Sequence, residues 1–232
     1  LNFSLGFSVR QNYLAARLAN PDFVNVFLGR LNQVVMDHNA GTGELVGEKV
    51  TLATQQALRS ARENDKHVSS RLIAASIRNG EQVAFLAGLD VLTIPPKAMK
   101  DYQDSGKLPD QVVSHIDDSI EPGVDPQHRF AKRFSELWQL SEEFRNFVDA
   151  LVARPDLDSM QGEELDKIAR DVNLFHPFSE DDLNKIQEHG KIPDLNAWPD
   201  SVALDDLMTQ SALQSFTKDQ NALDERIRSF LK

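Results

Sequence analysis

The sequence has no cysteine, no surplus of positive charge and no long apolar run. Without cysteine the chain can form neither disulfide bonds nor thiolate metal sites. The net charge of -11 argues against a nucleic-acid binder, whose basic surface would neutralise phosphates, and against adsorption to anionic membranes. No uncharged apolar run approaches the roughly 18–20 residues needed to span a bilayer. We therefore expect a cytoplasmic protein that binds neither nucleic acid nor membrane.

Several common functional signatures are missing as well. The sequence contains no glycine-rich phosphate loop and no nucleophile elbow. Asp37, His38 and Glu44 lie in a polar stretch without the spacing of a metal site, so we expect no metal. Leu1 opens directly on an apolar run with neither a basic leader nor a methionine. This beginning predicts that the chain is the C-terminal portion of a longer protein.

Strand-like and helix-like segments alternate over the first 106 residues. Residues 1–7, 23–29, 70–76 and 90–95 are short, nearly continuous apolar runs. Helical patterns follow three of them: one that Ser8 and Gln11 begin with a capping box, one from Asn79 to Gly88, and one from Pro95 to Gly106. Residues 43–64 form a longer helical pattern after a polar loop that follows the second run. Such alternation is typical of a parallel α/β sheet.

Two architectures fit this pattern. One is a (β/α)8 TIM barrel, of which the chain would supply the last four β/α units; the other is an open doubly wound sheet. Residues 110–201 differ in character, because they are acidic and mostly helical, with helical stretches at 129–153 and 163–171. Residues 202–232 contain an amphipathic closing helix. We predict domains at 1–109, 110–201 and 202–232.

Polar residues that follow the predicted strands are the first candidates for a site, since ligands of parallel α/β folds bind at the C-terminal strand ends. Arg30 follows the second run and Arg78 the third. Two guanidinium groups at this edge of an acidic chain suggest an anion site, although both could instead be solvated or paired with carboxylates. Asn2 and Ser4 point the same way on the first strand. They could bind sugar hydroxyls or a water, or simply satisfy polar groups at an edge.

Four segments, in this order along the chain, resemble transaldolases. They are NFSLGFS at 2–8, VFLGR at 26–30, AASIRN at 74–79 and LAGLDVLTIP at 86–95. They are similar to the family's fifth to eighth barrel strands, and FTKDQ at 216–220 is similar to its closing helix. The resemblance covers residues 1–100 and 205–232.

The resemblance implies a barrel enzyme that transfers a dihydroxyacetone unit between sugar phosphates through a lysine Schiff base, without a cofactor. By this resemblance a small set of residues would hold the substrate. Arg30, Ser76 and Arg78 would bind its phosphate, Asn2 and Ser4 would position the sugar and a water, and Asn25 and Phe27 would line the pocket. Asn25 stands where the family commonly has serine, and Ser4 where it usually has threonine.

The lysine itself is missing, because in the family it lies on the strand before the first one found here. Lys97 follows the fourth run and reads as a surface lysine. We therefore expect the missing N-terminal half of the barrel to supply the Schiff base. A simple ketose-phosphate aldolase, a non-catalytic phosphosugar-binding protein and a half-barrel that closes on a copy of itself, which would make a homo-oligomer, are the alternatives.

Overall fold

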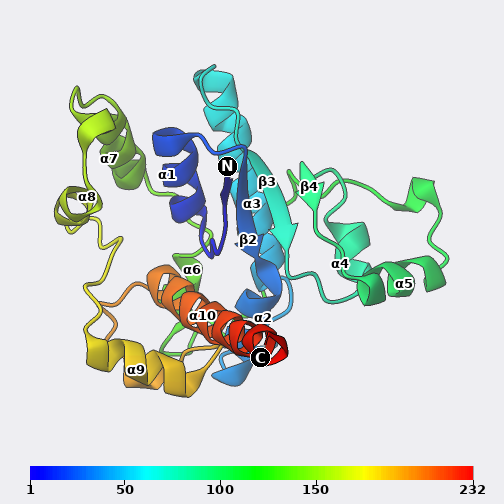
Figure 1. Cartoon of the computed structure of the whole chain (residues 1–232). Coiled ribbons are helices and arrows are strands. Elements are labelled where there is room, and N and C mark those ends of the chain that lie inside the picture. The colour runs from blue at the N-terminus through cyan, green and yellow to red at the C-terminus, as the bar shows by residue number, and fades with distance from the viewer. Residues whose placement is uncertain (232) are drawn as a thin grey trace.

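The computed structural model describes residues 1–231, and a four-stranded parallel sheet lies at its centre (Figure 1). The strands follow each other in chain order: β1 (Asn2–Phe3), β2 (Phe23–Phe27), β3 (Arg71–Ala75) and β4 (Val91–Leu92). Asn25 pairs with Ile73, and Ile73 pairs with Val91. The prediction of a parallel α/β fold is therefore confirmed.

Helices lie between the strands and after the last of them. They are α1 (Val9–Ala19), α2 (Leu28–Asp37), α3 (Val46–Asn64), α4 (Gly80–Phe85) and α5 (Pro96–Asp104). Ser8 begins α1 by accepting a hydrogen bond from the Gln11 amide at 3.2 Å, as its spacing predicts. The predicted polar loop after β2 is wrong, because Leu28 already begins a helix. Leu31, Val34 and Val35 bury one face of that helix, which explains why it forms.

The helices cover the two faces of the sheet unequally. Val24, Val26, Leu72 and Ala74 are fully buried on one face, where α1 and α3 contact the strands. The alternate positions Phe23, Phe27 and Ile73 are only partly buried, and Asn2 and Thr93 are exposed. Because neighbouring residues of a strand point to opposite faces, the described helices cover one face of the sheet far more than the other.

The remaining elements follow α5 along the chain. They are η1 (Pro109–Gln111), α6 (Ala131–Ser135), α7 (Glu142–Val152), η2 (Leu157–Ser159), α8 (Gly162–Ile168), α9 (Glu180–His189), η3 (Leu195–Ala197) and α10 (Leu204–Phe230). The single helix predicted at 129–153 is wrong. Val9 donates its amide to the Leu137 carbonyl, and Ser141 caps a new helix by accepting from the Phe144 amide, so the chain divides into α6 and α7.

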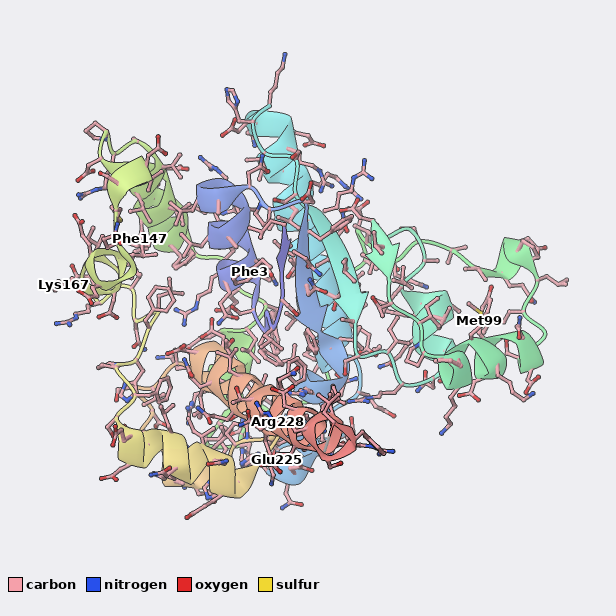
Figure 2. The ribbon with its side chains drawn as sticks, in the orientation of Figure 1. Phe3, Met99, Phe147, Lys167, Glu225 and Arg228 are labelled. Carbon is pink, nitrogen blue, oxygen red and sulfur yellow. The ribbon has the colours of Figure 1, made fainter. Side chains whose placement is uncertain are left out.

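The acidic segment shares the hydrophobic core of the sheet region. Phe134, Leu137 and Val148 are buried in the same cluster as Val9 and Leu14. In Figure 2, Phe147 on α7 lies to the left of the sheet and Met99 on α5 lies to its right, with Phe3 of β1 between them. Within residues 1–231, no helix is long and apolar enough to cross a membrane.

Candidate anion site

Arg30 and Arg78 lie at the C-terminal ends of adjacent strands. Arg30 is in the first turn of α2, directly after β2, and Arg78 follows β3 by three residues. The two side chains are close enough that the charge of Arg78 contributes to lowering the pKa of Arg30. Helix α10 crosses this end of the sheet (Figure 1) and is held there by Thr209, whose hydroxyl donates to the Leu5 carbonyl at 3.0 Å. Arg30 is thus buried between the end of β2, α2 and α10, and Arg78 lies exposed beside it.

Arg30 is a buried cation without a close counter-charge. Only 8% of the residue is exposed, and among residues 1–231 its Nη1 atom has no hydrogen-bond partner. Its Cζ atom lies 5.9 Å from the ring centroid of Phe27 and 5.4 Å from that of Phe216. Burial and Arg78 lower the pKa of Arg30, and only Asp219 acts in the opposite direction. A buried cation in this state is stabilised when an anion binds beside it.

The backbone around Ser76 is adapted to a close approach between β3 and α2. Ser76 has a φ of 67°, in the left-handed region that a serine adopts only at a cost in free energy. A Cβ atom placed on Gly29 would lie 2.3 Å from the Ser76 carbonyl oxygen and 2.6 Å from Arg78 Nε. Glycine at position 29 is therefore needed for the loop of Ser76 and Arg78 to lie against α2.

Gly29→Ala is expected to displace this loop and to destabilise the protein. The added methyl would meet the backbone of Ser76, which cannot move as a flexible side chain can. We expect a loss of stability of about 1–3 kcal/mol, typical of overpacking, in urea unfolding. Gly162→Ala is the matched control, because a Cβ atom there meets nothing within 4 Å. Equal stability of the two variants would contradict this packing.

A comparison with known protein families identifies the one to which this chain belongs. Residues 1–153 match the model of the transaldolase/fructose-6-phosphate aldolase family, which is more than half of the chain. The chain belongs to this family. Membership implies an enzyme of the aldolase or transaldolase type, and the resemblance predicted from the four strand segments is confirmed. None of the curated proteins compared with the sequence matches it.

The other residues that the transaldolase resemblance singles out lie on the less covered face of the sheet. Asn25 is buried and donates its Nδ2 to Asn2 Oδ1 at 2.5 Å and to the Phe3 carbonyl at 2.9 Å. Ser4 is exposed just beyond β1. Phe27 is half-buried at the end of β2, beside Arg30. The structure thus brings Asn2 and Asn25 into direct contact, and Phe27 next to Arg30.

Within residues 1–231, none of the strands β1 to β4 carries a lysine, and Lys97 is exposed in the first turn of α5. Within residues 1–231, no group of three or more histidine and acidic side chains could hold a metal ion. His38 instead links α2 to η3: its Nδ1 donates to the Val34 carbonyl, and its Nε2 accepts from the Leu195 amide.

Sequence reasoning missed one contributor to the site, the packing of Phe216 on Arg30. Phe216 lies on α10, and its ring centroid is 6.4 Å from that of Phe27. The sequence offered two signals, the apolar spacing of the final helix and the similarity of residues 216–220 to the closing helix of transaldolases, and neither indicates which residue Phe216 covers. Next to Arg78, Asn79 caps α4: its Oδ1 accepts from the Gln82 amide at 2.9 Å.

Proposed function

We propose that Arg30, Ser76 and Arg78 bind the phosphate of a sugar-phosphate substrate. The observation that carries this proposal is the buried guanidinium of Arg30, which has an unpartnered Nη1 within residues 1–231 and a second cation, Arg78, as its neighbour. Two like charges held together disfavour each other, and a dianionic phosphate relieves that repulsion. Planar guanidinium groups also match phosphate oxygens in bidentate geometry.

The reaction we infer is transaldolase-like transfer of a dihydroxyacetone unit between sugar phosphates through a lysine Schiff base. The lysine would come from a part of the enzyme outside these 232 residues, which agrees with strands that carry none. Asn2, Ser4, Asn25 and Phe27 would hold the sugar on the less covered face of the sheet. The imine would serve as the electron sink, so the mechanism requires no metal or cofactor.

The enzyme we infer is a (β/α)8 barrel in which β1 to β4 form one half. Support comes from the partly exposed Phe23, Phe27 and Ile73, whose face of the sheet would become the barrel interior. The other barrel half would cover this face and pair with the free edges of β1 and β4. Residues 110–201 would act as an accessory segment, and α10 would close the barrel.

Simple aldol cleavage of a ketose phosphate is the second candidate. The matched family includes fructose-6-phosphate aldolases as well as transaldolases. Both reactions use the same phosphate site and differ in whether a second sugar or a proton accepts the cleaved fragment. A phosphosugar-binding protein without catalysis would also keep the site.

Arg78→Ala is expected to weaken binding of fructose 6-phosphate roughly 10- to 100-fold, because charge-assisted hydrogen bonds contribute about 1.5–3 kcal/mol each. Affinity for unphosphorylated fructose should stay unchanged. Calorimetric titration of both sugars measures this difference. The matched control is Arg71→Ala, since Arg71 is exposed at the opposite end of the same strand. Equal losses for the two sugars, or an equal effect of Arg71→Ala, would rule out the phosphate assignment.

A further inference from the structure

A buried hydrogen-bonded network joins the two elements that carry the arginines. Asn32 lies on α2, two residues after Arg30, and its Nδ2 donates to Glu48 Oε2 at 3.1 Å. Gln82 on α4 donates its Nε2 to Glu48 Oε1 at 2.7 Å. The Oε1 of Gln82 in turn accepts from the backbone amide of Arg78 at 2.7 Å. Glu48, on α3, is only 3% exposed and stands between them.

The carboxylate of Glu48 determines the direction of every bond in this network. An ionised carboxylate only accepts hydrogen bonds, so both neighbouring amides must turn their NH2 groups toward it. The oxygen of Gln82 then faces the amide of Arg78, and the oxygen of Asn32 faces the amide of Gly47, at 2.6 Å. If either amide were flipped, its NH2 group would meet a backbone N–H and its oxygen would meet a carboxylate oxygen of Glu48, so both of its hydrogen bonds would be lost.

The network around Glu48 ends on the two segments that carry Arg30 and Arg78. The bond from Asn32 to Glu48 holds α2, which carries Arg30. The bonds from Gln82 to Glu48 and from the Arg78 amide to Gln82 hold the loop of Ser76 and Arg78. Two effects disfavour this arrangement of the segments. One is the repulsion between their guanidinium groups, and the other is the strained left-handed backbone of Ser76. Residues elsewhere must therefore hold the loop against α2.

We infer that Glu48 and Gln82 are positioning residues of the phosphate site: Glu48 orients Gln82, and Gln82 holds the backbone of Arg78 at the distance from Arg30 that a phosphate requires. Neither residue needs to touch the substrate. The inference rests on the proposed function, because it assigns these residues to the site where the phosphate would bind. It predicts that replacing the carboxylate of Glu48 by an amide of the same size lowers the affinity for a sugar phosphate, although residue 48 does not touch the substrate.

The test is a double-mutant cycle measured by calorimetric titration of the 232-residue chain with fructose 6-phosphate and with fructose. Glu48→Gln keeps the shape but turns an NH2 group toward one of the two donors. We expect a roughly 3- to 10-fold loss of affinity for fructose 6-phosphate, comparable to one lost hydrogen bond, and no loss for fructose. Gln82→Glu should lose affinity similarly, since it places two carboxylates face to face.

The double variant Glu48→Gln/Gln82→Glu restores every bond with the charge moved to position 82. Gln at 48 accepts from Asn32 and donates to Glu at 82, which accepts from the Arg78 amide. We expect it to bind fructose 6-phosphate more tightly than either single variant. Thr54→Val is the matched control, because it removes a buried hydrogen bond of 2.7 Å on the same helix without touching the network.

The outcomes separate this inference from the proposed function. If the wild-type chain binds fructose 6-phosphate no better than fructose, the proposed phosphate site fails. If the wild type prefers the phosphorylated sugar but Glu48→Gln keeps that preference, the positioning inference alone fails. It also fails if Thr54→Val reproduces the selective loss, or if the double variant binds fructose 6-phosphate no better than the tighter-binding of the two single variants.

Discussion

Asp205→Asn is expected to lower the free energy of unfolding by about 3–5 kcal/mol at pH 7, because it leaves the charge of Arg10 without its partner. Asp205 is 2% exposed at the start of α10. Its carboxylate accepts from Arg10 Nε and Nη2, both at 2.7 Å, and from the Ser8 hydroxyl at 2.6 Å. An asparagine side chain would turn an NH2 group toward some of these donors.

This ion pair also explains how α10 reaches the anion site. The guanidinium of Arg10 donates to the carbonyls of Val172 and Asn173, each at 3.1 Å, so α1, the loop before α9 and the start of α10 meet at one point. Further along α10, Phe216 packs on Arg30. Loss of the pair should therefore reduce fructose 6-phosphate affinity as well as stability.

Urea unfolding of the wild type and of Asp205→Asn measures the stability effect. Burial acts to raise the pKa of Asp205, but Arg10 and Ser8 outweigh it and hold the pKa below its ordinary value. The stability from this carboxylate is thus present above the pH at which the unfolded group ionises, about 3.9. It is lost as pH falls through the lower folded-state pKa. Asp149→Asn, in the more exposed pair with Arg17, is the control, expected to cost about 1 kcal/mol or less. A loss of that size for Asp205→Asn would contradict the assignment.

Asp206→Asn is expected to stabilise the protein by about 2–4 kcal/mol at pH 8. Burial raises the pKa of Asp206 to about 7, and neighbouring Asp205 adds to the effect, although the His176 amide donates to its Oδ2 at 2.7 Å. The folded state therefore keeps a proton that the unfolded state loses near pH 4. Stability falls as pH rises from about 4 to 7. Asparagine keeps an acceptor for His176 and has no charge to bury.

Unfolding experiments at pH 5 and pH 8 test this prediction. The gain of Asp206→Asn over the wild type should be larger at pH 8, where Asp206 is ionised in its buried site. Asp200→Asn is the control, because the side chain of Asp200 is 78% exposed and should show no such dependence. A gain that is the same at both pH values would show that Asp206 titrates as an exposed carboxyl group.

The sequence was sufficient for the elements that rest on local patterns. The apolar runs locate all four strands, and Ser8, Asn79 and Pro96 begin helices where their side chains predict. It also placed both arginines at the correct strand ends. The predicted strand lengths were too long, since β1 and β4 contain two residues each. Strand length depends on pairing with neighbours, which apolar runs alone do not define.

Features that depend on distant contacts could not be predicted. Helix α2 was missed because Gln33 and Asp37 make its outer face polar, and its apolar face is recognisable only against α3. The burial of Arg30 depends on Phe216, which is far away along the chain. The network of Glu48 joins three helices through side chains, none of which belongs to a recognisable motif.

The arginine side-chain NMR spectrum during titration with fructose 6-phosphate tests the central claim most directly. The Nε–H signals of Arg30 and Arg78 should shift together and saturate, because a bound phosphate adds a charged acceptor to both guanidinium groups. Fructose should shift neither signal, and the signal of Arg10, already paired with Asp205, should stay in place. Unchanged Arg30 and Arg78 signals, or equal shifts with both sugars, would contradict a phosphate site at the ends of β2 and β3.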